Sequence, residues 1–139
     1  MNSLQAQVIR GSRVQEHVED DVRTLLGLEL CFDDGSWLTL RCAVDGLSLE
    51  VEPQPMRWID VPERGHIEVH GHHQLCRVLR PGTMLTREQP LLGAGQHTVG
   101  VALATQQDDI YVFNWCGGLH FARELPPEIL PPPILQVRA

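Results

Sequence analysis

The sequence contains no lysine, because all eleven of its basic residues are arginines. A Walker-type phosphate loop, a kinase-type ATP site and a Schiff-base enzyme each depend on a lysine, so these three classes are excluded. No apolar run approaches the ~20 residues of a membrane-spanning helix. A basic stretch followed by an apolar core, which marks a secretory signal, is missing from the first residues as well. We therefore expect a cytoplasmic protein.

Recognisable catalytic and cofactor motifs are also lacking. The four cysteines form no CxxC pair, which argues against a zinc ribbon and against a thioredoxin-type redox site. HExxH, GxSxG and GxGxxG do not occur. The sequence accordingly predicts no catalytic residue and no cofactor-binding residue, and we expect the thiols to be reduced.

The charge balance limits the kind of partner. Eighteen acidic residues against eleven basic ones give a formal net charge of −7. The arginines are scattered from Arg10 to Arg138 without forming a basic stripe, which argues against nucleic acid and against anionic membranes. An acidic protein is better suited to a basic partner protein, which electrostatic steering would bring together with it.

Alternating apolar and polar residues predict a mainly β protein. The chain of 139 residues is one domain, large enough to bury a core without a disulfide or a metal. Strand-like runs separated by turn residues occupy residues 28–32, 37–43, 47–52, 98–105 and 110–115. The first two flank an Asp-Asp-Gly-Ser turn, a strong hairpin signal. The third run follows them to make a meander, and the last two are expected to form a second hairpin. We predict antiparallel hairpins in a small sandwich or half-open barrel over residues 1–125, with an α+β fold as the alternative.

Three segments are interpreted less directly. Val14, Val18 and Val22 recur at helical spacing, which predicts one short N-terminal helix over residues 12–26. The alternative is a strand interrupted at residues 19–21, because β-branched valines lose rotamer freedom in a helix. Residues 74–79 are expected to extend or pair with a strand over 65–73. Residues 83–95, with their proline and glycines, are expected to form a loop.

The last residues, 126–139, form a proline-rich tail that should be extended. Four large aliphatic residues would expose an apolar patch if the tail were free in water: Ile129, Leu130, Ile134 and Leu135. The sequence therefore predicts that the tail packs on its own domain or on a neighbouring subunit. In the second case the protein would be a homodimer formed through the tail.

A histidine cluster carries the candidate metal site. Residues 66–73 contain four histidines and a glutamate, and the predicted ligands are His66, Glu68, His70 and His72. In a strand the first three share one face, while Ile67 and Val69 point to the other. Imidazole and carboxylate suit a transition metal such as zinc. Next neighbours on one face are about 6.6–6.8 Å apart, so two of them can chelate one ion.

Further ligands for such a site must come from elsewhere. A bend at Gly71 would bring His70 and His72 together, and His97 or His120 would supply a third ligand. The alternative is a solvent-facing strand whose polar residues simply point outward. No other cofactor is predicted.

These observations favour a non-enzymatic protein-interaction module. The expected profile is a small acidic cytoplasmic protein, comparable to an immunity protein or an adaptor. The alternative, from a different class, is a metal-binding β protein or a metal-dependent enzyme that uses residues 66–73.

Overall fold

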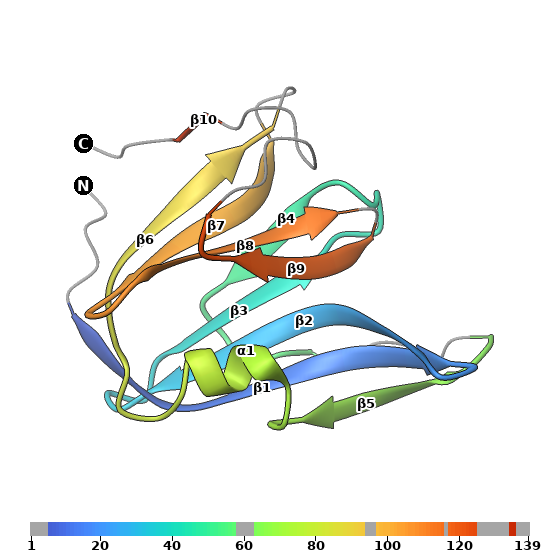
Figure 1. Cartoon of the computed structure of the whole chain (residues 1–139), viewed down its shortest axis with the longest axis horizontal. Helices are drawn as coiled ribbons and strands as arrows, with labels where there is room; N and C mark the ends of the chain where they lie inside the picture. The colour runs from blue at the N-terminus through green and yellow to red at the C-terminus, as the bar shows by residue number, and fades with distance from the viewer. Residues whose placement is uncertain (1–5, 58–62, 94–96, 116, 125–133, 136–139) are drawn as a thin grey trace.

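The computed structural model describes residues 6–57, 63–93, 97–115, 117–124 and 134–135. Within them the chain is mainly antiparallel β with little helix, which confirms the predicted class (Figure 1). The strands are β1 (Gln7–Glu19), β2 (Val22–Phe32), β3 (Trp37–Cys42), β4 (Leu49–Glu52), β5 (His66–His70), β6 (Met84–Leu92), β7 (Thr98–Thr105), β8 (Asp109–Trp115), β9 (Gly118–Ala122) and β10 (Ile134–Leu135). The short helix α1 (Gln74–Val78) connects β5 to β6. None of the described helical structure is long and apolar enough to cross a membrane.

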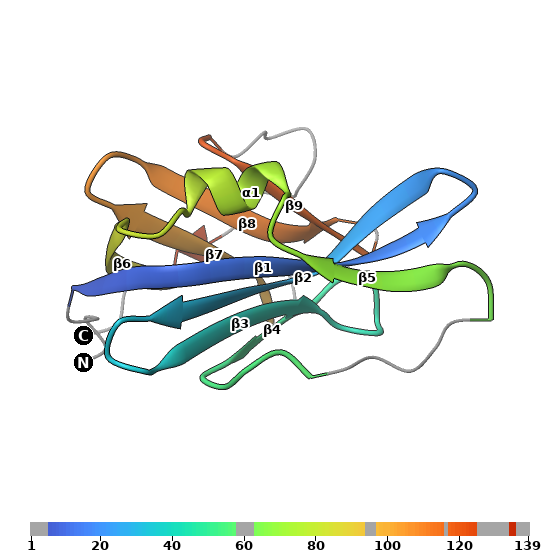
Figure 2. The ribbon, with the colours of Figure 1, turned by 90° about the horizontal axis from the view of Figure 1, so that it is seen from below.

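The strands form an open sheet in the order β4-β3-β2-β1-β6-β7-β8-β9. Strand β1 runs along the whole molecule, with β5 beside one half of it and β6 beside the other end (Figure 2). The predicted meander of β2, β3 and β4 is confirmed, and so is the hairpin of β7 and β8. Gly35 closes the turn between β2 and β3 with a φ of 86°, a backbone conformation that glycine adopts readily.

The predicted helix over residues 12–26 is wrong, and the strand alternative is confirmed. These residues form the hairpin of β1 and β2, in which Glu19 pairs with Val22 around a two-residue turn. Asp20 and Asp21 have φ values of 49° and 66°, the positive pair that a type I′ turn needs. A spacing of four residues fits one face of a helix and also one face of a strand, so the valines did not distinguish the two.

Two further predictions need correction. Residues 74–78 form α1 instead of strand, and the His73 side chain caps it by accepting a hydrogen bond from the Leu75 N–H at 3.0 Å. Residues 84–92 form β6 instead of a loop. Pro90 of β6 lies opposite Val101 of β7. It has no backbone N–H to donate, and it is tolerated because this stretch of β6 has no described neighbour on the side away from β7.

One core lies between the β1–β4 strands and the β6–β9 strands. Strand β9 lies against β2 and β3, and α1 adds Leu75 and Leu79 to the same core (Figure 1). The largest fully buried side chains of this core come from both groups of strands: Ile9, Leu28, Leu30, Phe32, Leu40, Leu85, Leu103 and Ile110. Of the predicted tail, only residues 134–135 are described, and they pair as β10 with β6. The other tail residues lie outside the described part of the chain.

The close approach of β7 and β8 depends on Gly100. A Cβ atom added there would lie 2.7 Å from the Val112 carbonyl oxygen and 2.9 Å from the Phe113 Cβ. We predict that Gly100→Ala lowers the free energy of unfolding by about 1–3 kcal/mol, measured by urea denaturation. Gly11→Ala in β1 is the matched control, because nothing lies within 4 Å of its added Cβ. Equal stability of the two variants would contradict this packing.

Candidate functional site

The C-terminal half of β1 pairs with β5 and so brings the predicted metal ligands next to polar residues of β1 and β2. Strand β5 pairs antiparallel with β1, so that Glu68 lies opposite Glu16 and His70 opposite Val14. On the other side of β1, Arg23 lies opposite Val18. Directly opposite residues share one face of a sheet. His66, Glu68 and His70 therefore share a face, as predicted, and Glu16 and Arg23 share it with them.

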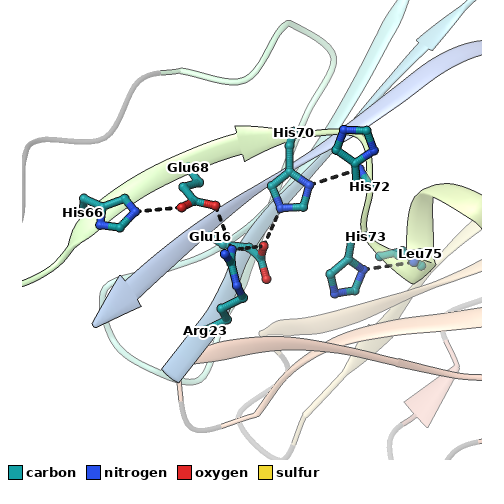
Figure 3. A network of polar contacts seen from close by, with 8 residues as sticks. All are labelled: Glu16, Arg23, His66, Glu68, His70, His72, His73 and Leu75. Atoms are coloured by element: carbon teal, nitrogen blue, oxygen red, sulfur yellow. Dashed lines mark hydrogen bonds and ion pairs between the residues drawn. The ribbon is translucent and has the colours of Figure 1, made fainter. Parts of the chain in front are cut away.

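Two carboxylates and one arginine form the centre of this face (Figure 3). The Arg23 Nη1 donates to Glu68 Oε1 at 2.8 Å and to Glu16 Oε1 at 3.3 Å. Glu68 Oε2 lies 2.7 Å from His66 Nε2, and Glu16 Oε1 lies 2.5 Å from His70 Nε2. Each carboxylate is therefore bound by one histidine and by the shared arginine.

The hydrogen bonds of His70 fix where its proton is. The backbone N–H of His72 donates to His70 Nδ1 at 3.1 Å, so this nitrogen is unprotonated. In the neutral ring the proton is on Nε2, which donates to Glu16 Oε1. The Glu16 side chain is only 6% exposed, so this donor replaces water for a buried carboxylate. Because both ring nitrogens are occupied, His70 has no free nitrogen with which to act as a general base.

An open cleft of about 460 Å³ adjoins this network. It is lined by two carboxylates, an arginine and three histidines: Glu16, Arg23, Glu68, His70, His72 and His73. The His70 and His72 rings stack with their centroids 5.9 Å apart, and the His73 ring meets the Phe121 ring edge-on. Burial lowers the pKa of His73, so its neutral form is favoured. The cleft thus offers imidazole and carboxylate groups in a single pocket.

The predicted metal ligands are close together but are already bound to protein groups. His66 and Glu68 contact each other, whereas His70 contacts Glu16 and stacks on His72. Over the described ranges, no group of three or more histidine, cysteine or acidic side chains is arranged to hold a metal ion. Arg23 supplies the positive charge between the carboxylates that a bound cation would otherwise supply.

The proposed additional ligands lie elsewhere. The His120 ring stacks on Phe113, and the His97 carbonyl accepts the Gly93 N–H. Neither histidine lines the cleft.

Sequence reasoning missed Glu16 and Arg23. The prediction of a helix over residues 12–26 placed them on an isolated polar face rather than opposite β5. The signal that would have found them is the strand alternative: with a turn at Asp20 and Asp21, both residues fall on the same face as the histidines.

Two of the cysteines in the described part of the chain, Cys42 and Cys76, show no sign of nucleophilic chemistry. Cys31, Cys42 and Cys76 are free thiols, and Cys116 lies outside the described residues. Burial raises the pKa of Cys42 to about 12 and also raises that of Cys76. A raised pKa disfavours the thiolate, which is the reactive form.

Comparison with known proteins adds no assignment. The chain matches no protein-family model, and searches of curated proteins and of solved structures gave no significant match. Any functional conclusion therefore depends on the residues themselves. The network just described and its adjoining cleft offer hydrogen-bonding groups to a ligand.

The contact between His70 and Glu16 should contribute measurably to stability. We predict that His70→Ala lowers the free energy of unfolding by about 1–3 kcal/mol, because it leaves the buried Glu16 carboxylate with only the longer contact to Arg23. The matched control is His72→Ala, whose exposed ring only stacks on His70; its effect should be below about 0.5 kcal/mol. Denaturant midpoints at neutral pH measure both. Similar losses in the two variants would be the opposing result.

The network should also weaken in acid. Hydrogen bonds from His66 and then Arg23 lower the pKa of Glu68 from 4.5 to about 2. Glu68 of the unfolded chain takes up its proton near 4.5, so this contribution to stability is present above that pH and is lost as the pH falls towards 2. We expect the Glu68 carboxyl carbon to titrate near 2 by NMR, and His66→Ala to raise that midpoint. His97→Ala should leave it unchanged; an unshifted midpoint in His66→Ala would refute the assignment.

Proposed function

We propose that this chain is a non-enzymatic protein-interaction module, a small acidic cytoplasmic protein that binds a basic partner protein. The observation that carries the proposal is a concentration of exposed apolar side chains. Six large apolar residues are exposed among the described residues, and four of them lie on β4, on the turn before it or at the end of β8: Val44, Leu47, Val51 and Trp115. We call these four residues the β4 patch.

A hydrogen bond joins two of the segments that carry the β4 patch, the turn before β4 and the end of β8. The Asn114 Nδ2 donates to the Ser48 carbonyl oxygen at 2.8 Å, and the Asn114 side chain is buried. This bond holds the end of β8 against the turn before β4. Exposed apolar residues gathered in this way mark interaction surfaces, and tryptophan is frequent among residues that dominate binding energy. The β4 patch therefore supports a contact with another protein.

Charge around the β4 patch favours a basic partner. Hydrogen bonds from Ser48 and Leu47 lower the pKa of Asp45 to about 2, so its carboxylate is ionised at neutral pH. Glu50 and Glu52 on β4 are each neutralised by one arginine, so Asp45 supplies the negative charge at the patch. Strand β4 is also an edge of the sheet, which can receive a partner's strand. Together with the net charge of −7, Asp45 is complementary to a basic surface.

We also propose that the strands enclose the core as a small sandwich or half-open barrel, with residues 126–139 packed on it or on a neighbouring subunit. The position of β9 against β2 and the pairing of β10 with β6 support this arrangement. A homodimer through the tail follows if β10 of one chain can replace that of another.

The interaction proposal predicts which variants lose the partner. A basic protein captured from a cell lysate by the wild-type chain and then purified should bind Trp115→Ser or Leu47→Ser at least about tenfold more weakly. The matched control is Val22→Ser, which removes an equally exposed apolar residue from the β1–β2 turn. Isothermal titration calorimetry measures the three affinities. Equal affinity of all three variants would rule out the β4 patch.

The second candidate is a metal-binding β protein, or a metal-dependent enzyme, that uses residues 66–73. It is supported by one observation, the three histidines and two carboxylates that line the same cleft. If it is correct, untagged protein dialysed against zinc retains the metal stoichiometrically, and the double variant His70→Ala and His72→Ala loses it. The control is His97→Ala with His120→Ala, outside the cleft. Equal zinc content in both double variants would exclude this candidate.

A further inference from the structure

A second cleft, on the other side of α1, gathers positive charge in this acidic chain. It has a volume of about 430 Å³ and is bounded by α1, the residues after it, the β7–β8 turn and the end of β9. The charged and amide side chains that line this cleft are Gln74, Arg77, Arg80, Gln107, Asp108 and Arg123. Three of the eleven arginines in the chain therefore surround one cavity.

The arginines of this cleft differ in their partners. Arg123 forms an ion pair with Asp108 across the cleft. Arg77 and Arg80 form no ion pair with any carboxylate in the described ranges. With three guanidinium groups and one carboxylate, the cleft has a local charge of about +2, whereas the chain as a whole carries −7. A cleft lined by positive charge attracts small anions.

We propose that this cleft is a binding site for a small phosphate dianion, either inorganic phosphate or the phosphate group of a monoester. Guanidinium groups present fixed forks of N–H donors that match phosphate oxygens, often two at a time. Val78 and Ile110 also line the cleft. The net charge of −7 selects against a long polyanion such as nucleic acid, because repulsion from the rest of the surface grows with each added phosphate.

Asp108 has a specific part in this site. Its carboxylate occupies Arg123 in the absence of a ligand, in the place that a phosphate oxygen would take. An incoming phosphate therefore competes with Asp108 for this guanidinium. Removal of the carboxylate should strengthen phosphate binding, whereas a site of purely structural function would gain nothing from it. This site is independent of the proposed partner contact, because none of the β4 patch residues lines the cleft.

The experiment is a titration of the full chain with sodium phosphate at about pH 7 and constant ionic strength, followed by NMR of backbone amides and arginine Nε–H groups. Saturable shifts should be confined to the cleft. Arg77→Gln or Arg80→Gln should weaken binding about tenfold. The control Arg87→Gln, which removes an exposed arginine of β6 outside the cleft, should not change it.

The sharper comparison is between two neighbouring aspartates. Asp108→Asn should tighten phosphate binding about threefold or more, because the competing charge is removed. Asp109→Asn changes the net charge equally but lies outside the cleft lining, so it should have no effect. Shifts that fail to saturate, or equal effects of the two variants, would overturn the proposal.

The choice of ligand is tested with glycerol 3-phosphate and succinate. Tighter binding of the monoester than of inorganic phosphate assigns the site to phosphorylated metabolites, and the reverse order assigns it to free phosphate. Binding of succinate as tight as that of phosphate would refute a phosphate site.

Discussion

Strand β1 is hydrogen-bonded along both of its sides, and this double pairing positions the rest of the molecule. One side of β1 pairs with β2 almost throughout. The other side pairs with β6 at residues 7–8 and with β5 at residues 14–18. Because β5 and β6 both run antiparallel to β1 on this side, the chain between them continues in one direction along β1, and the residues of the connection leave the sheet. Helix α1 forms part of that connection, and Leu75 on the helix and Leu79 directly after it are buried in the core.

The same pairing explains why polar groups are buried beside β1. A register shift between Gln15 and Glu16 places Glu16 opposite Leu25 of β2. On its other side Glu16 lies opposite Glu68, so it shares a face of the sheet with the histidines of β5. A carboxylate buried there must be hydrogen-bonded, and His70 and Arg23 provide those bonds. The histidines of β5 are therefore integrated into the fold, and a ligand that uses them has to compete with these internal bonds.

Helix α1 separates two clefts of different character. His73, the residue that caps the helix, lines the cleft of histidines and carboxylates. Gln74 and Arg77, on the helix itself, line the arginine cleft. The cleft at the start of this five-residue helix thus gathers histidines and carboxylates, whereas the other cleft gathers arginines. Both are distinct from the β4 patch, whose residues line neither cleft.

Local patterns in the sequence predict the antiparallel class, the β2–β3–β4 meander, the β7–β8 hairpin and the shared face of His66, Glu68 and His70. These features depend on local alternation and on turn residues such as Gly35. The folded structure was needed to show that residues 12–26 are a hairpin, since a spacing of four fits helix and strand alike and a turn of two aspartates gives a weak signal. It alone brought Glu16 and Arg23 to the histidines, and Arg123 to Arg77 and Arg80. Residues far apart in the chain meet through strand pairing and packing, which local patterns do not encode.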